Sequence, residues 1–198
     1  MNRLHHWLCR SDHWRETLKQ RLPWVLNGTE LGPSVLEVGP GPGLTTDLLR
    51  ASVAKLTALE IDPKSVGTLT ARLQGTNVRV VPGDATSMPF GEAEFSSAVC
   101  FTMLHHVPSP ELQDKVLLEV FRVLKPGGCF VGTDSLQNLF MKIIHIGDTL
   151  VPVNPDTFGS RLERTGFCAV EVEKGRDAFR FRARKPVVTH DFDSWRFA

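Results

Sequence analysis

The sequence has no tyrosine, almost no net charge and no long apolar run, and each absence excludes a class of protein. The 23 Lys and Arg residues nearly balance the 22 Asp and Glu residues, so the formal net charge is +1. A near-neutral chain has no overall field to attract nucleic acid, and we expect a small-molecule partner instead. No stretch approaches the roughly 18 unbroken apolar residues of a membrane-spanning helix, so no transmembrane segment is expected. The absence of tyrosine removes the tyrosine acid of one large class of NAD-dependent reductases.

Cysteine is scarce and scattered, at Cys9, Cys100, Cys129 and Cys168. No C-x-x-C pair occurs, and the wide spacing indicates reduced thiols. The first residues also lack the apolar core of a signal peptide, so we expect a cytoplasmic location. One group has metal-ligand spacing, namely His5, Cys9 and His13. Because Ser11 and Asp12 interrupt the helix that would align this group, and no fourth ligand is evident, no metal site is predicted.

Residues 34–46 form the most informative stretch of the chain. An apolar run that contains Glu37 leads into the loop G-P-G-P-G at 39–43, and helical periodicity begins at Leu44. This order predicts a strand, a tight loop and a helix, with glycines where the backbone takes positive φ or lies against a ligand. Pro40 and Pro42 lack the N–H groups that would bind a dinucleotide pyrophosphate, which favours a nucleoside ligand without phosphates. An ordinary strand-to-helix loop is the alternative.

The predicted strand at 55–60 ends in an acidic residue, Glu60, and Asp84 follows the predicted strand at 77–81. Glu60 is placed to accept hydrogen bonds from both hydroxyls of a ribose. Asp84 can accept the amino group of an adenine while the backbone N–H of Ala85 donates to a ring nitrogen. Alternatively, Asp84 caps the turn that follows it.

Predicted strands alternate with predicted helices along the chain. Strands are expected at 34–38, 55–60, 77–81, 95–101 and 129–133, and helices at 63–73, 110–124 and 155–165. This alternation is typical of a parallel, doubly wound α/β sheet, whose ligand lies beyond the carboxyl ends of the strands. Residues 1–33 are expected to form an N-terminal helical cap in which Pro23 ends a helix. A helix packed on the sheet is expected here. The alternative is that its Trp-rich face covers the cofactor or touches a membrane surface.

Five motifs occur in order: E-V-G-P-G-P-G, L-E-I-D, G-D-A-x-x-M-P-F, L-H-H-V and F-R-V-L-K-P-G-G. Together they resemble the class I S-adenosylmethionine-dependent methyltransferases, in the small-molecule branch that includes the ubiquinone and menaquinone biosynthesis enzymes. The resemblance is dense over residues 34–134 and loose as far as residue 186. It implies S-adenosylmethionine as the cofactor and one Rossmann-like domain at 34–186, followed by a tail at 187–198. Helices would cover both faces of a seven-stranded sheet whose last strand is antiparallel.

The resemblance also implies roles for individual residues. The cofactor-binding set consists of Glu37 with the backbone of Gly39, Gly41 and Gly43 at the methionine end, Glu60 and Ile61 at the ribose, Asp84 and Ala85 at the adenine, and Phe101 and Thr102 near the sulfonium. One departure is Ser96, where the family usually has an acidic residue. We expect this departure to affect local packing rather than activity.

Two further features point to the acceptor. Residues 136–153 are rich in apolar side chains without an obvious sheet partner, which predicts a mobile wall of the acceptor pocket or else a plain packed helix. His105 and His106 follow the fourth strand and Asp134 the fifth, at the sheet edge where the methyl group would be. Imidazole suits a general base near neutral pH and a carboxylate can orient it, so these three are the candidate catalytic residues. We expect at most one histidine to face the pocket, and catalysis by proximity alone is the alternative.

The sequence therefore predicts an S-adenosylmethionine-dependent methyltransferase with a small, apolar or lipid-like acceptor. The acceptor atom (O, N or C) and the oligomeric state stay undetermined. The alternative from another class is a methyltransferase-like module that binds the cofactor without chemistry and acts through partners. A nucleic-acid methyltransferase ranks lower, because the fourth strand exits without the Asn-Pro-Pro-Tyr type of tetrad that clamps a flipped base.

Overall fold

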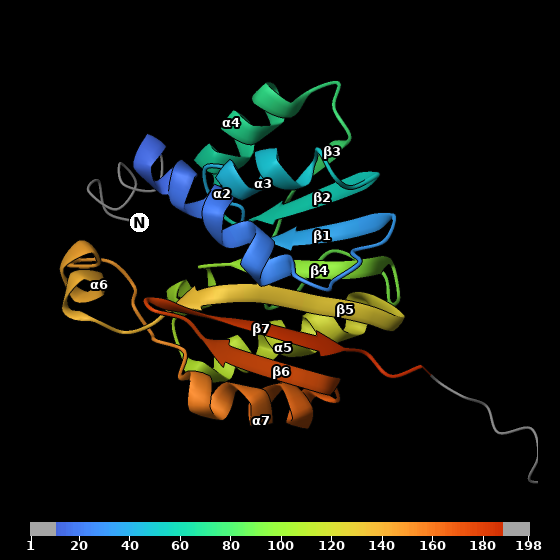
Figure 1. Ribbon diagram of the computed structural model, residues 1–198. Coiled ribbons are helices and arrows are strands. Elements are labelled where there is room, and N and C mark those ends of the chain that lie inside the picture. Colours follow the sequence, from blue (N-terminus) through green and yellow to red (C-terminus); the bar gives the residue numbers. More distant parts are fainter. Residues whose placement is uncertain (1–10, 188–198) are drawn as a thin grey trace, which may run out of the picture.

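Seven strands form one sheet in the computed structural model, which describes residues 11–187 (Figure 1). The strands are β1 (Ser34–Val38), β2 (Lys55–Glu60), β3 (Val78–Pro82), β4 (Phe95–Phe101), β5 (Leu124–Ser135), β6 (Cys168–Lys174) and β7 (Ala178–Arg184). Their order across the sheet is β3-β2-β1-β4-β5-β7-β6. The neighbours among β1 to β5 are parallel, whereas β7 runs antiparallel to both β5 and β6. The predicted doubly wound sheet with an antiparallel last strand is confirmed.

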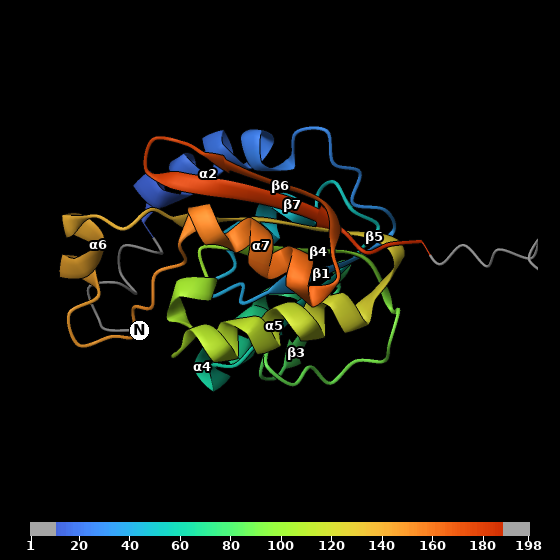
Figure 2. The ribbon, with the colours of Figure 1, turned by 90° about the horizontal axis from the view of Figure 1, so that it is seen from below.

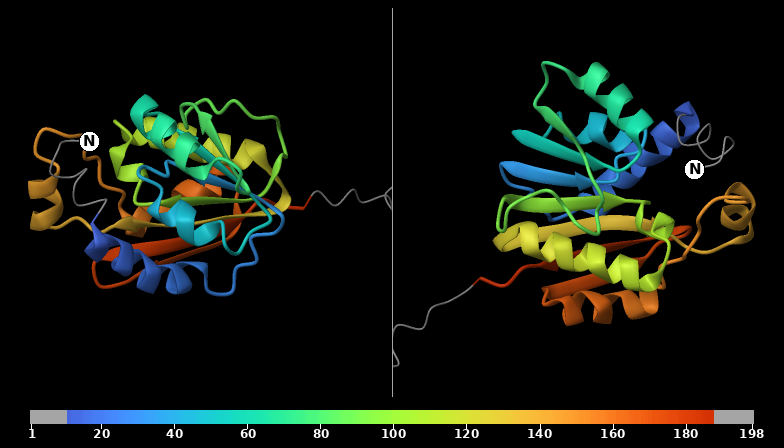
Figure 3. Two further views of the ribbon diagram at one scale, coloured as in Figure 1. Left: turned by 90° about the horizontal axis from the view of Figure 1, so that it is seen from above. Right: turned by 180° about the vertical axis from the view of Figure 1, so that it is seen from behind.

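Helices cover both faces of this sheet. They are α2 (Asp12–Leu26), α3 (Leu44–Leu49), α4 (Pro63–Leu73), the 3-10 turn η1 (Leu104–His106), α5 (Pro110–Val123), α6 (Leu139–Ile144) and α7 (Pro155–Thr165). Val25 of α2 and Leu49 of α3 belong to the core on one face. Val120 of α5 and Phe158 of α7 belong to the core on the other. In Figure 2, α2 lies above the strands and α5 and α7 below them, and Figure 3 shows α5 and α7 crossing the back of the sheet.

Local capping chemistry explains why the predicted helix boundaries hold. The side chain of Asn154 accepts the N–H of Asp156 at 3.0 Å, and Pro155 opens α7 where a missing N–H loses no intrahelical bond. Gly166 closes the helix with a φ of 110°, a left-handed conformation that favours glycine. The helices predicted at 63–73 and 155–165 are confirmed.

The prediction that Pro23 ends the first helix is wrong, because α2 continues to Leu26. A proline in the last turn removes a single N–H donor, which limits the loss to about one hydrogen bond. Contacts with the sheet hold this turn in place. The indole N–H of Trp24 donates to Glu173, and the carbonyl of Trp24 accepts from Arg180. Tertiary contacts therefore set the end of α2.

Strand β5 begins earlier than the sequence predicts, and a serine in β4 bonds to the start of β1. β5 begins at Leu124, earlier than predicted, because Leu124 pairs with Phe95 ahead of a register shift in the ladder. The hydroxyl of Ser96 accepts the N–H of Ser34 at 3.0 Å and donates to the carbonyl oxygen of Ser34 at 2.7 Å. Ser96 thus ties β4 to the start of β1.

Some sequence predictions fall at the ends of the chain. His5 and Cys9 lie outside the described residues, as does the tail after residue 187. Cys100, Cys129 and Cys168 form no disulfide. Within residues 11–187, none of the helices combines the length and the apolar character needed to cross a bilayer.

Candidate active site

A cavity of about 1060 Å³ opens at the carboxyl ends of the parallel strands. Its walls come from the loop after β1, the ends of β2 and β4, the turn after β3 and residues 136–153. Helix α2 adds Trp14 and Leu18 to the wall. In Figure 1, α6 projects beyond the strand ends on this side of the sheet. Open α/β sheets bind their ligands at this position.

The three glycines of the loop after β1 have different physical reasons to be glycine. All three have positive φ, at 67° for Gly39, 55° for Gly41 and 82° for Gly43. A Cβ atom on Gly39 would collide with Met103, and one on Gly43 would collide with Leu69, whereas one on Gly41 would meet nothing within 4 Å. Gly39 and Gly41 line the cavity, and Gly43 does not. The structure therefore assigns Gly43 to packing against α4 rather than to the cavity.

The N–H groups of this loop are used within the protein. Gly39 donates to the carbonyl of Leu59 at 2.9 Å, Gly41 to a carboxylate oxygen of Glu60 at 2.9 Å, and Gly43 to the carbonyl of Pro40 at 2.9 Å. The two prolines between them have no N–H to offer. The loop thus lacks the row of inward N–H donors that holds a pyrophosphate, in agreement with the sequence prediction against a dinucleotide.

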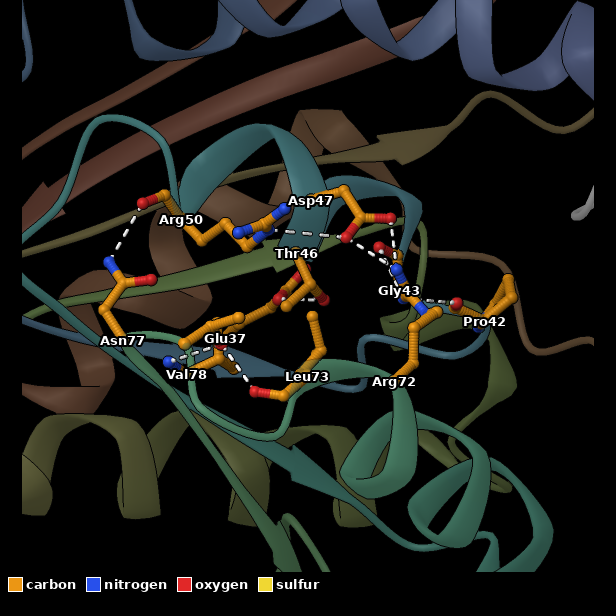
Figure 4. Close-up of polar contacts among 11 residues, drawn as sticks. Glu37, Pro42, Gly43, Thr46, Asp47, Arg50, Arg72, Leu73, Asn77 and Val78 are labelled. Carbon is orange, nitrogen blue, oxygen red and sulfur yellow. Dashed lines mark hydrogen bonds and ion pairs between the residues drawn. The ribbon is translucent and has the colours of Figure 1, made fainter.

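Arg72 on α4 holds the same loop from behind (Figure 4). Its guanidinium bonds both carboxylate oxygens of Asp47 on α3 at 2.6 Å. It also donates to the carbonyls of Pro42 and Gly43 at 3.3 and 3.4 Å. The sequence did not indicate these contacts, because nothing distinguishes Arg72 from an ordinary polar residue near the end of a helix.

Glu37 is buried beneath the loop and does not line the cavity. Its carboxylate accepts hydrogen bonds from the hydroxyls of Thr45 and Thr46, the latter at 2.6 Å. Burial raises the pKa of Glu37 to about 7, against the lowering effect of the two hydroxyls. Glu37 therefore joins β1 to the first turn of α3, whereas the resemblance implied a role at the methionine end of the cofactor.

The acidic residues of the next two strand ends do lie at the cavity. Glu60 is only 6% exposed, and its carboxylate also accepts the N–H of Asp62 at 2.9 Å. Asp84 accepts the N–H of Thr86 at 2.8 Å, so it caps its own turn while also lining the cavity. Ile61 and Ala85, the other two residues predicted here, line the cavity as well. The two alternatives for Asp84 are therefore compatible.

Thr102 turns the chain at the end of β4. Its φ is 49°, which is unusual for a β-branched residue, and its N–H donates to the carbonyl of Thr133 at 2.8 Å. Thr102 and Phe101 both line the cavity, as predicted. A strained backbone of this kind persists where the surrounding structure enforces it, and such positions concentrate at functional sites.

His105 and Asp134 form a buried pair at the same end of the sheet. Nδ1 of His105 lies 2.5 Å from Oδ1 of Asp134, and the backbone N–H of His105 donates to Oδ2 at 3.2 Å. The two residues are 3% and 0% exposed. Because the carboxylate can only accept, Nδ1 carries the proton and Nε2 keeps its lone pair when the ring is neutral.

Two further histidine rings lie beside this pair. The ring centre of His106 is 4.2 Å from that of His105, and His145 lies 5.2 Å from both. Nδ1 of His145 lies 2.7 Å from the carbonyl oxygen of Met141, and burial lowers the pKa of His145. All three histidines line the cavity, so the expectation that at most one would face the pocket is wrong. Sequence reasoning missed His145, although a histidine within an apolar stretch expected over the site was a usable signal.

Residues 136–153 contribute one wall of the cavity. Those that line it are Asn138, Met141, Ile144, His145, Asp148 and Thr149. The far end is anchored, since the N–H of Val151 donates to the carbonyl of His105 at 2.8 Å. Leu139 and Ile146, by contrast, are each 72% exposed. The predicted position over the site is confirmed, and mobility stays a prediction.

Comparison with known proteins shows which family the chain belongs to. The methyltransferase-domain family matches residues 36–132. An uncharacterized methyltransferase of Synechocystis sp. is 32% identical over 149 residues, which cover 70% of this chain and 68% of that protein. A ubiquinone biosynthesis O-methyltransferase of Dechloromonas aromatica is 32% identical over 115 residues, 54% of this chain and 47% of that protein. The match thus spans about half the length of this second relative.

A solved structure shows the same fold. The N-methyltransferase NodS from Bradyrhizobium japonicum, in complex with S-adenosyl-L-homocysteine, superposes with a TM-score of 0.68 at 19% identity over 90% of both chains. The chain belongs to the S-adenosylmethionine-dependent methyltransferases.

Proposed function

We propose that the protein transfers a methyl group from S-adenosylmethionine to a small, apolar or lipid-like acceptor. The observation that carries this proposal is the continuity of one cavity from Gly41, Glu60 and Asp84 to the histidines and the apolar wall at residues 136–153. A cofactor at the first group would present its methyl end to an acceptor at the second. The name of the ubiquinone biosynthesis O-methyltransferase supports an acceptor of lipid-like character.

The residues at the strand ends fit this cofactor. Each carboxylate oxygen of Glu60 accepts one backbone N–H, which fixes the group and leaves a lone pair on each oxygen for a ribose hydroxyl. The space above Gly41 is open, so the methionine part has room where a Cβ would intrude. We assign Asp84 and Ala85 to the adenine, with Ile61 beside the ribose and Gly39, Phe101 and Thr102 toward the sulfonium. Glu37 and Gly43 support the loop without touching the ligand.

Bound S-adenosylmethionine supplies a methyl group on a positively charged sulfur, and the protein has to hold an acceptor in line with it. Proximity and alignment can supply about 7–11 kcal/mol of rate enhancement in well-oriented systems. Phe101, Met141 and Ile144 give the acceptor side an apolar lining. This lining favours a hydrophobic acceptor and keeps water from competing with it.

The His105–Asp134 pair is the proposed proton acceptor when the reacting group is a hydroxyl or a protonated amine. As the acceptor takes the methyl group and sulfur keeps the electron pair of the broken carbon–sulfur bond, the proton of the acceptor would pass to Nε2 of His105. Asp134 holds the ring and stabilises the imidazolium that forms. His106 lines the same wall and is the second candidate.

The test is formation of S-adenosylhomocysteine. The purified protein is incubated with S-adenosylmethionine and a panel of quinols, phenols, fatty acids and amines, and the product is measured by mass spectrometry. We expect turnover with an apolar member of the panel and none with polar analogues of equal size. Tight cofactor binding without product from the panel or from a broad cell extract would instead favour a non-catalytic module that acts through partners.

A further inference from the structure

The three histidines at the acceptor end have the arrangement of a metal site. One ring nitrogen from each of His105, His106 and His145 lies within 4.8 Å of those of the other two. Two of the rings come from η1 and the third from the segment after α6, so the group forms only in the folded chain. The sequence prediction of no metal site concerned His5, Cys9 and His13. The present group was not recognisable in the sequence, because His145 is far from the other two histidines along the chain.

The partners of the rings are those that metal-binding histidines need. A histidine that ligates a metal through one nitrogen usually donates the other N–H to a carboxylate or a backbone carbonyl, which fixes the tautomer and the orientation of the ring. Nδ1 of His105 is held by Asp134, and Nδ1 of His145 by the carbonyl of Met141. In both rings Nε2 is therefore the nitrogen that carries the lone pair.

The geometry requires only small adjustments. Ligand nitrogens about 2.0–2.1 Å from a tetrahedral zinc ion lie about 3.3 Å from one another. Moving three atoms from at most 4.8 Å apart to that spacing shifts each of them by less than about 1 Å, which small side-chain rotations can provide. Three imidazoles suit Zn²⁺ and other first-row divalent ions, and they are a poor set for Mg²⁺ or Ca²⁺, which prefer oxygen ligands.

We propose that His105, His106 and His145 bind one divalent transition-metal ion, best matched by Zn²⁺, with the fourth coordination position open to the cavity. All three side chains line the same cavity, and three protein ligands with one open position are typical of catalytic rather than structural zinc sites. The ligand for the open position is the acceptor, through its hydroxyl oxygen. A cation there lowers the pKa of that group, so its proton leaves to solvent and His105 no longer has to take it. This last step rests on the proposed function, whereas metal binding does not.

Metal binding can be measured without any methyl transfer. The full-length chain without a polyhistidine tag is stripped with a chelator and titrated with ZnSO₄ in a calorimeter and with CoCl₂ in a visible spectrometer. We expect one ion per chain and the visible absorption of tetrahedral Co²⁺. His145→Ala should weaken binding at least 100-fold, and Asp134→Asn should weaken it about 10–100-fold through the orientation of His105.

The control is His13→Ala, which removes a histidine that lines the same cavity but is not in the three-histidine group, and it should leave metal affinity unchanged. Thermal melting and calorimetry with S-adenosylmethionine show that each variant is folded. Failure of the parent protein to bind Zn²⁺ or Co²⁺, or unchanged affinity in folded His145→Ala, would overturn the proposal. Methyl transfer by chelator-stripped protein at the parental rate would overturn the activating role of the ion while leaving the proposed function intact.

Discussion

Glu60 and Gly41 are joined by a hydrogen bond of 2.9 Å from the loop N–H to the carboxylate. The last residue of β2 therefore fixes the loop that follows β1, and one carboxylate both shapes the loop and faces the cavity. Glu60 is consequently the residue whose replacement should affect cofactor binding most directly.

Replacing Glu60 with alanine should weaken S-adenosylmethionine binding by about 1.5–3 kcal/mol, because a charge-assisted contact to the ribose is lost. Calorimetry of the parent and the variant measures the difference. Glu163→Ala removes an exposed carboxylate from α7 and should leave the affinity unchanged. Unchanged affinity in Glu60→Ala, or NAD binding by the parent with comparable strength, would refute the assignment.

The loop glycines give a paired prediction. Gly43→Ala should reduce the free energy of unfolding by more than the roughly 1–2 kcal/mol of a non-glycine residue at positive φ, because its Cβ would also collide with Leu69. Gly41→Ala should show only the φ penalty, since its Cβ meets nothing, but it should weaken cofactor binding. Urea denaturation and calorimetry separate the two effects. Equal losses of stability in both variants would show that the packing around Gly43 is not what requires glycine.

The buried carboxyl of Glu37 predicts a pH dependence of stability. Its pKa rises from 4.5 to about 7 on folding, so the folded state holds the proton more tightly than the unfolded state. The resulting stabilisation is fully present below about pH 4.5 and is lost as the pH rises through 7, with an upper limit of about 3 kcal/mol. Glu37→Gln cannot ionise, so its stability relative to the parent should increase between pH 5 and 8. A constant difference in unfolding free energy across that range would contradict a raised pKa.

The sequence could predict the sheet and several residues that line the cavity at its edge, because each of those features is local. Residues 39–43, Glu60 and Asp84 are recognisable beside their own strands, and the topology of a doubly wound sheet then brings them to one edge. The contacts of Arg72 with the loop and of His145 with His105 could not be predicted, since each joins elements that meet only in the packed fold. The continuation of α2 past Pro23 had the same cause, a contact with a distant strand.

Residues 136–153 should respond to ligands. Their outer side chains, such as Leu139 and Ile146, are exposed, whereas Val151 is bonded to His105. We expect amide hydrogen exchange around α6 to slow when cofactor and acceptor are both present, because the wall then packs against the acceptor. Peptides from α7 provide the reference and should exchange at the same rate with and without ligands. Identical exchange of residues 136–153 in all states would indicate a plain packed segment.

The final prediction separates general base catalysis from proximity alone. With the true acceptor and chelator-stripped protein, His105→Ala should lower turnover about 100-fold or more while cofactor affinity stays intact. Asp134→Asn should lower turnover too. A carboxylate can only accept, so it keeps the ring proton on Nδ1 and the lone pair on Nε2, whereas an amide can also donate and no longer enforces that tautomer. His106→Ala tests the neighbouring ring, which lines the same cavity and whose centre is 4.2 Å from that of His105. A smaller effect in His106→Ala than in His105→Ala would identify His105 as the base. Near-parental turnover in all three variants would mean that the site works by holding the acceptor in line with the methyl group and that no side chain has to remove the proton.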